Sequence, residues 1–149
     1  MVMKFPIGIQ SFESLRSEGF VYVDKTALVK KLVSEGKCYF LSRPRRFGKS
    51  LLMSTIEAYF KGKKHLFEGL AMAELETEWK EHPVLHLDLN AKPYTKLQDL
   101  YDLLDDQLTY YERQYDSIAT DKSPEGRFRQ LIRSAKQKTG RGAVVLVDE

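Results

Sequence analysis

The sequence predicts an α/β fold in which a parallel sheet is covered by helices on both faces. Apolar runs typical of strands alternate with segments of helical periodicity along the 149 residues. One such run, at residues 37–41, leads through a basic loop to Gly48-Lys49-Ser50 and then to a helical segment. A later run, at residues 143–147, is followed directly by Asp148 and Glu149.

Two helices are predicted before the basic loop. Ser11 is a typical N-cap for a short helix that ends at Gly19. After an extended piece at residues 20–23, Asp24 can cap a second helix that ends at Gly36. The apolar face of this second helix is expected to carry Leu28, Leu32 and Val33.

The segments on either side of the loop are predicted as a buried strand and a helix. Residues 37–41 form a short apolar run bounded by turn signals, so we expect a strand in which Cys38 is a core residue. The helix is expected over residues 49–60, and its apolar stripe consists of Leu52, Ile56, Tyr59 and Phe60.

The second half of the chain predicts a strand, two helices and a final strand. Residues 83–89 alternate in hydropathy as a strand does, and a long helix follows from Thr95. Ser123-Pro124-Glu125 is a strong helix start, and Gly140 ends that helix before the strand at residues 143–147. The stripe of the long helix consists of Leu97, Leu100, Tyr101, Leu104, Leu108, Tyr111 and Tyr115.

The composition fits one globular domain. Apolar residues make up 42% and charged residues 30% of the chain. The N-terminus lacks the apolar run of a signal peptide, and no run approaches the length of a membrane span. The single cysteine cannot form an internal disulfide, which favours a reduced, cytoplasmic setting.

The charge is unevenly distributed along the chain. Residues 1–64 hold 13 Lys/Arg and 5 Asp/Glu, whereas residues 65–116 hold 4 and 12. The basic end could attract the phosphates of a nucleotide or of a nucleic acid. Alternatively, the two blocks could neutralise each other in the folded protein.

The basic loop departs from the usual phosphate-binding pattern Gly-x-x-x-x-Gly-Lys-Ser/Thr, because Arg43 stands where the first glycine is expected. The end of the loop fits that pattern. Gly48 lets the backbone come close to a ligand, Lys49 supplies a cation for the β- and γ-phosphates, and Ser50 offers a hydroxyl to Mg²⁺.

Arg43, Arg45 and Arg46 have three possible roles. Their guanidinium groups could bind the phosphates of the nucleotide, adding charge where the missing glycine removes flexibility. They could bind a nucleic acid or the acidic surface of a partner, or they could form a solvated loop. Phe47 is interpreted as a packing wedge, with base stacking as the alternative.

The end of the chain matches the Walker B pattern, an apolar strand that ends in Asp-Glu. Asp148 is then expected to hold Mg²⁺ through water, and Glu149 to polarise the attacking water as general base. Since this pattern follows the Gly-Lys-Ser loop in the expected order, the sequence predicts a nucleotide site.

The chain resembles the opening of the bacterial AAA-ATPase-like family in three stretches, which are FPIGIQSFESLR, GFVYVDKT and YFLSRPRRFGKSLL. The resemblance covers nearly all of the chain, and members of this family commonly carry a C-terminal PD-(D/E)XK nuclease-like domain. It implies a three-layer P-loop NTPase-type parallel sheet flanked by helices, truncated here after the Walker B strand. Residues 1–149 would be one N-terminal P-loop ATPase-like domain, with residues 1–36 as a lead-in and residues 37–149 as the start of the NTPase core.

The resemblance also implies a set of site residues and the cofactors ATP and Mg²⁺. Lys49 and Glu149 are the expected catalytic residues, and Ser50 and Asp148 the expected metal ligands. The expected nucleotide-binding residues are Arg43, Pro44, Arg45, Arg46, Phe47, Gly48, Lys49, Ser50 and Leu51. The function implied is an ATPase that acts by attack of water on the γ-phosphate in the intact protein.

In P-loop ATPases with a catalytic glutamate, a further strand lies between the Walker A and Walker B strands, and here it would follow residue 149. We therefore expect this chain alone to hydrolyse ATP poorly or not at all, and the unfilled slot could favour a homo-oligomer. The alternative function is a non-hydrolysing nucleotide switch or a nucleic-acid-binding module that uses the basic N-terminal region. No membrane contact is expected.

Three further residues have two interpretations each. Tyr22 could pack on an adenine base, or it could be a half-buried structural residue. Asp24 lies in the same segment and could also lie near the nucleotide, or it could be only a helix cap. Asp88, near the end of the predicted strand, could face the phosphate site or cap a turn.

Overall fold

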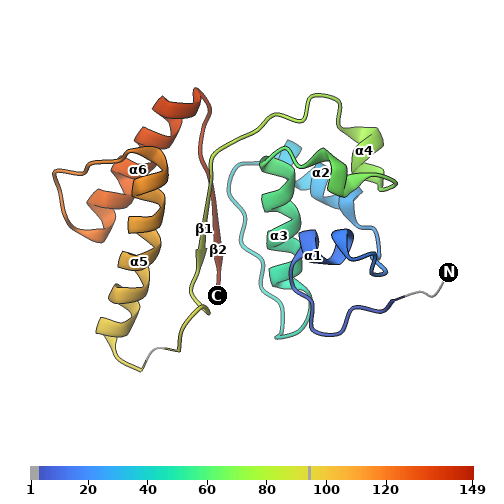
Figure 1. Cartoon of the computed structure of the whole chain (residues 1–149), viewed down its shortest axis with the longest axis horizontal. Helices are drawn as coiled ribbons and strands as arrows, with labels where there is room; N and C mark the ends of the chain where they lie inside the picture. The colour runs from blue at the N-terminus through green and yellow to red at the C-terminus, as the bar shows by residue number, and fades with distance from the viewer. Residues whose placement is uncertain (1–3, 94) are drawn as a thin grey trace. The chain divides into compact units, whose positions relative to one another are not determined.

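The structure is a computed structural model that describes residues 4–93 and 95–149. Within these residues the chain forms six α-helices, one short 3₁₀ helix and two strands, which confirms the mixed α/β class (Figure 1). The chain divides into two compact units, Met1–Glu81 and His82–Glu149. None of the helices in the described ranges is long and apolar enough to cross a bilayer.

The first unit consists of helices. They are α1 (Phe12–Ser17), α2 (Thr26–Glu35), α3 (Lys49–Phe60), the 3₁₀ helix η1 (Lys64–Phe67) and α4 (Ala71–Leu75). The predicted cap of α1 is confirmed, because Ser11 Oγ accepts a hydrogen bond from the Ser14 N–H at 3.2 Å. Phe12 and Phe67 are fully buried, and their rings pack at a tilt with centroids 4.9 Å apart, so they join α1 to η1 in the core.

A polar contact shared by α2 and α4 fixes the starts of both helices. Asp24 Oδ1 accepts hydrogen bonds from the Thr26 N–H at 2.8 Å and from the Thr26 hydroxyl at 2.7 Å. Asp24 Oδ2 accepts from the Ala71 N–H at 2.7 Å, and Thr26 Oγ1 accepts from the Met72 N–H at 3.0 Å. Burial alone would raise the pKa of Asp24, but the hydrogen bonds from Ala71 and Thr26 outweigh it and lower that pKa.

The second unit contains β1 (Val84–Asp88), α5 (Leu97–Tyr115), α6 (Pro124–Thr139) and β2 (Val144–Asp148). The strands pair in parallel, with Val84 opposite Val144 and Asp88 opposite Asp148. Parallel strands need a crossover connection, which α5 and α6 provide on one side of the strand pair (Figure 1). The core of this unit consists of Leu85, Leu108, Tyr115, Leu131 and Ala135.

The two helices of the second unit are joined by an arginine. The predicted start of α6 is confirmed, because Ser123 Oγ accepts from the Gly126 N–H at 3.1 Å. One turn later, Arg127 donates to both carboxylate oxygens of Glu112 on α5, each at 2.9 Å, and also pairs with Asp105. Such a bidentate pair fixes the helix orientation more strictly than a single hydrogen bond.

The predicted strand at residues 37–41 is wrong. These residues have no strand structure, and Tyr39 and Phe40 are 52% and 85% exposed. A strand needs a neighbour for its backbone hydrogen bonds, and the sheet of the described residues pairs only β1 with β2. Tyr39 instead donates its hydroxyl to the Leu32 carbonyl of α2 at 2.7 Å.

Two further expectations depended on that strand. Cys38 is exposed, so its assignment to the core is wrong. The three-layer parallel sheet is not evident in the described residues, where the sheet has two strands. The confirmed part of the fold prediction is therefore the α/β class and the parallel pairing of the strands.

The apolar faces of two helices differ in detail from the predicted stripes. On α2, Val29 is buried whereas Leu28 is 66% exposed. On α5, Leu103 is buried, whereas Leu97 and Tyr101 are exposed. Periodicity predicts that an apolar stripe exists, but the neighbouring helix decides which residues at the edges of the stripe are buried. That neighbour is α4 for α2 and α6 for α5.

Candidate functional site

The loop that was predicted to bind phosphate enters α3 through a left-handed glycine. Gly48 precedes α3 with φ 74° and ψ 23°, a conformation that glycine adopts without the steric cost of a Cβ atom. No atom of the described residues lies within 4 Å of the position that a Cβ at Gly48 would take. The backbone conformation, rather than a lack of space, therefore favours glycine here.

The first turn of α3 offers backbone donors to a ligand. The Leu52 N–H bonds to the Gly48 carbonyl at 3.0 Å, so the N–H groups of Lys49, Ser50 and Leu51 precede the first intrahelical bond. Among the described residues, no side chain caps this end of the helix. Because α3 is 12 residues long, its peptide dipoles also favour an anion at this end. This geometry fits a phosphate group.

The three arginines lie in an exposed turn before Gly48. Arg45 and Arg46 form the turn, and Arg46 has φ 66°, which is uncommon for a residue with a side chain. Arg43, Arg45 and Arg46 are exposed, and none has a hydrogen bond or ion pair to a residue in ranges 4–93 and 95–149. Their positive charge is therefore not neutralised by the described part of the chain.

The remaining loop residues differ in exposure. Phe47 is 62% exposed, so its interpretation as a packing wedge is wrong. Pro44 is exposed, and Lys49, Ser50 and Leu51 are half-buried in the first turn of α3. The structure thus places residues 43–51 in one continuous loop and helix start, while their role in binding a nucleotide stays a prediction.

The second group of predicted site residues lies at the carboxyl end of β2. Asp148 is 8% exposed, Glu149 is exposed, and Asp148 lies opposite Asp88 in the strand pair. Ligands of open α/β sheets bind outside the carboxyl ends of the strands, so both acids are at a suitable edge. Asp88 Oδ1 accepts from the Asn90 N–H at 2.8 Å, which is the predicted turn cap.

The two groups belong to different units, the loop to Met1–Glu81 and the acids to His82–Glu149. In the described ranges, no group of three or more His, Cys, Asp or Glu side chains is arranged to hold a metal ion. The assignment of Ser50 and Asp148 as magnesium ligands, and of Lys49 and Glu149 as catalytic residues, therefore stays a prediction.

Tyr22 and Asp24 have structural roles. Tyr22 is half-buried and packs edge-on against Phe12, with ring centroids 5.2 Å apart. Burial raises the pKa of the Tyr22 hydroxyl. Asp24 accepts hydrogen bonds from the first N–H groups of α2 and α4, those of Thr26 and Ala71, from one position before the N-cap residue of α2. The structure therefore confirms the structural interpretation of both residues.

Sequence reasoning missed two polar residues that bind backbone. Thr26 is fully buried and links Asp24 to α4, and the sequence signal was the Asp-x-Thr spacing at a helix start. Gln107 binds both backbone groups of Asp88, at 2.9 Å and 2.8 Å. Its signal was weaker, a polar side chain four residues before Tyr111 on the long helix.

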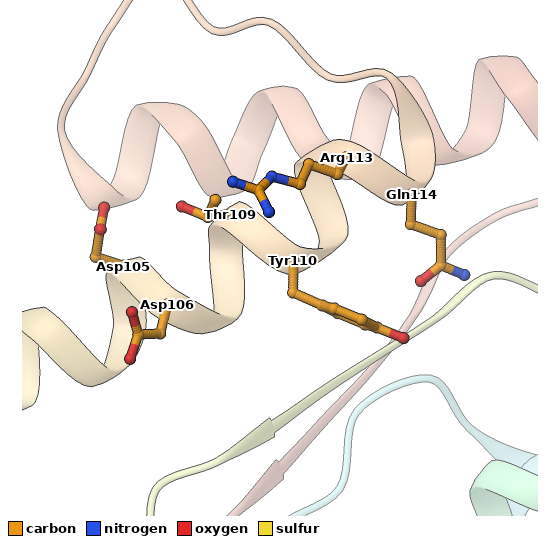
Figure 2. A pocket seen from close by; sticks show the side chains of 6 residues that line it. All are labelled: Asp105, Asp106, Thr109, Tyr110, Arg113 and Gln114. Atoms are coloured by element: carbon orange, nitrogen blue, oxygen red, sulfur yellow. The ribbon is translucent and has the colours of Figure 1, made fainter.

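A surface pocket lies along α5, and none of the predicted site residues lines it. Figure 2 shows its side chains, with Arg113 reaching toward Thr109 and Tyr110 pointing to the opposite side. The lining residues are Asp105, Asp106, Thr109, Tyr110, Arg113 and Gln114. Two of these six side chains are acidic and one is basic, so the lining carries no excess of positive charge for a phosphate.

Comparison with known proteins gives a family match over most of the chain. A family model described as "Predicted AAA-ATPase" matches residues 6–149. The chain is also 40% identical over 147 residues to a protein of Azotobacter chroococcum mcd 1 described as "Uncharacterized protein in vnfD 5'region". That match covers 98% of this chain and 28% of the relative. No solved structure matches the chain.

Proposed function

Since the chain belongs to the AAA-ATPase-like family, we propose that it is an ATP- and Mg²⁺-binding P-loop domain. The observation that carries this proposal is the loop at Gly48. A left-handed glycine stands directly before a helix that begins with Lys49 and Ser50, and the first N–H groups of this helix have no hydrogen-bond partner among the described residues. Backbone donors, a helix dipole and a lysine cation in one place are the elements of a phosphate site.

Each site residue has a proposed role in the intact protein. The ammonium group of Lys49 would contact the β- and γ-phosphates, and the Ser50 hydroxyl would be a ligand of Mg²⁺. Asp148 would hold the same ion through water, and Glu149 would orient the attacking water as general base. A three-layer P-loop sheet is part of this proposal, as is hydrolysis of ATP.

The Azotobacter relative is described as uncharacterized, and this chain spans 28% of its length. The activity of the whole protein, a C-terminal nuclease-like domain and a homo-oligomeric state are therefore proposals. A cytoplasmic location is also a proposal. It is supported by the single cysteine, which cannot form an internal disulfide, because disulfides are rare in the cytosol.

Isothermal titration calorimetry of the 149-residue chain with Mg·ATP tests the proposal. Lys49→Ala is expected to reduce affinity at least about tenfold, because a hydrogen bond from a charged group is worth about 1.5–3 kcal/mol. Lys64→Ala is the matched control, since Lys64 is an exposed lysine outside the loop. Equal affinity of folded Lys49→Ala and wild type would refute the phosphate-loop assignment.

A second candidate function is binding of single-stranded nucleic acid, without hydrolysis, by the basic loop. It is favoured by the exposure of Arg43, Arg45 and Arg46 and of the neighbouring Phe47. Single-stranded nucleic acids are commonly held by basic side chains together with an aromatic ring on which a base stacks. The dependence of binding on salt separates this candidate from a nucleotide pocket.

A further inference from the structure

The edge of β1 that faces away from β2 carries backbone groups that another strand would normally bind. The Val144 N–H bonds to the Pro83 carbonyl, and the Leu89 N–H bonds to the Asp148 carbonyl, each at 2.8 Å. With the parallel register of the pair, the odd-numbered residues 83–89 therefore direct their hydrogen bonds toward β2. The N–H and C=O groups of His86 and Asp88 point to the outer edge.

Two side chains of α5 bind these outward groups. Tyr111 Oη accepts from the His86 N–H at 2.9 Å and donates to the His86 carbonyl at 3.1 Å. Gln107 Oε1 accepts from the Asp88 N–H at 2.9 Å, and its Nε2 donates to the Asp88 carbonyl at 2.8 Å. Each side chain thus binds one donor and one acceptor, as a residue of a neighbouring strand would.

The spacing of the two elements explains why one helix can do this. Gln107 and Tyr111 are four residues apart on α5, which is a rise of about 6 Å. His86 and Asp88 are two residues apart on β1, which is about 6.6 Å. The contacts run in opposite chain directions, as they must when a helix follows a strand and packs back along it.

We infer that Gln107 and Tyr111 close the outer edge of β1 against pairing with a strand from a second copy of this chain. An open strand edge is a template for pairing with another chain, and proteins often block such edges. In this chain, Gln107 and Tyr111 protect the edge by binding its N–H and C=O groups directly. A strand from a second copy would first have to displace both side chains of α5.

Hydrogen exchange of single amides, measured by NMR on the 149-residue chain, tests the contacts. Gln107→Met keeps the length of the side chain but removes its polar atoms, and should speed exchange of the Asp88 N–H about tenfold or more. Tyr111→Phe should do the same for the His86 N–H. Gln98→Met and Tyr110→Phe are the matched controls, since both residues are exposed on the same helix.

Gln107→Glu provides an independent check on the Asp88 contact. Its carboxylate can accept from the Asp88 N–H but cannot donate to the Asp88 carbonyl. We therefore expect the Asp88 N–H to stay protected in this variant. Exchange of the Asp88 N–H as fast as in a folded Gln107→Met protein would overturn the assigned geometry.

Sedimentation equilibrium tests the consequence for association. The double variant Gln107→Met/Tyr111→Phe should shift to higher mass with increasing concentration, relative to the wild type. The double control Gln98→Met/Tyr110→Phe should not, and association through other surfaces is common to all three proteins. The inference is overturned if both amides stay protected in the single variants, or if the double variant keeps the wild-type mass while both amides exchange freely.

Discussion

Gly48 has the most demanding backbone conformation of the proposed phosphate loop. Its φ of 74° lies in the left-handed region, where a side chain collides with the following carbonyl oxygen. The next residue already belongs to α3, so any change at Gly48 alters the direction in which the first-turn N–H groups point. Stability and ligand binding are therefore coupled at this one residue.

Gly48→Ala is expected to lower the free energy of unfolding by about 1–2 kcal/mol, because alanine in the left-handed region is strained. The same substitution should weaken binding of Mg·ATP. Urea denaturation measures the first effect and calorimetry the second. Gly142→Ala is the control, since Gly142 has no positive φ and no neighbour of the described residues within 4 Å of its Cβ position. Equal stability of the two variants would contradict the argument.

Among the elements of the first unit, three helices meet at one carboxylate. Glu76 follows α4, and its Oε2 accepts from Lys30 Nζ of α2 at 2.5 Å and from Tyr59 Oη of α3 at 2.6 Å. The side chain of Glu76 is 9% exposed. The hydrogen bond from Lys30, and next the one from Tyr59, lower the pKa of Glu76 from 4.5 to about 2.

This pKa shift predicts how stability depends on pH. The folded protein binds the ionised carboxylate better, so the contribution of Glu76 is fully present above pH 4.5 and is lost as the pH falls toward about 2. At pH 7, Glu76→Gln should lower the free energy of unfolding by about 1–3 kcal/mol. The free energy of unfolding of the Glu76→Gln protein should then change less between pH 4.5 and pH 2 than that of the wild type.

Urea denaturation at a series of pH values measures both effects. Glu74→Gln is the matched control, because Glu74 is an exposed glutamate of α4 with no hydrogen bond or ion pair in the described ranges. We expect the control to behave as the wild type at neutral pH. A Glu76→Gln protein that is as stable as the control at pH 7 would show that the carboxylate does not stabilise the three-helix contact.

For the whole molecule, the distribution of charge is the property that bears on function. Part of the basic N-terminal block is neutralised by acids of the same unit, as in the ion pairs Lys30–Glu76 and Lys63–Glu13. The arginines at 43, 45 and 46 have no such partner in the described ranges. Three positive charges of the block that have no such partner therefore lie close together in the sequence of the proposed phosphate loop, where they favour an anionic ligand.

Changing Arg43, Arg45 and Arg46 together to glutamine should weaken binding of Mg·ATP, and wild-type binding should require Mg²⁺. Single-stranded oligonucleotides should bind weakly by comparison. If nucleic acid were the ligand, log K would fall with log salt with a slope of about −0.7 for each phosphate contacted. Fluorescence anisotropy at several salt concentrations measures this slope. A steep slope that the triple variant abolishes, without any need for Mg²⁺, would favour the second candidate function.

The parts of this protein that the sequence determined by itself are those set by neighbours a few residues apart. Ser11 and Ser123 cap helices as predicted, and Asp24 bonds to the first N–H of α2 from the position before its N-cap, because such bonds join groups within three residues of each other. The Gly-Lys-Ser loop leads into a helix for the same local reason. The two strands, though not their pairing with each other, were predictable because hydropathy alternates along residues 83–89 and residues 143–147 are apolar.

Tertiary structure alone decided what depends on a distant partner. Residues 37–41 have the composition of a strand, yet they are exposed because no neighbour supplies their hydrogen bonds in the described chain, and Cys38 is exposed with them. Gln107 looks like a polar residue of an amphipathic helix until β1 is placed beside it. A backbone hydrogen bond or a buried surface needs two partners, and the sequence of one segment specifies only one of them.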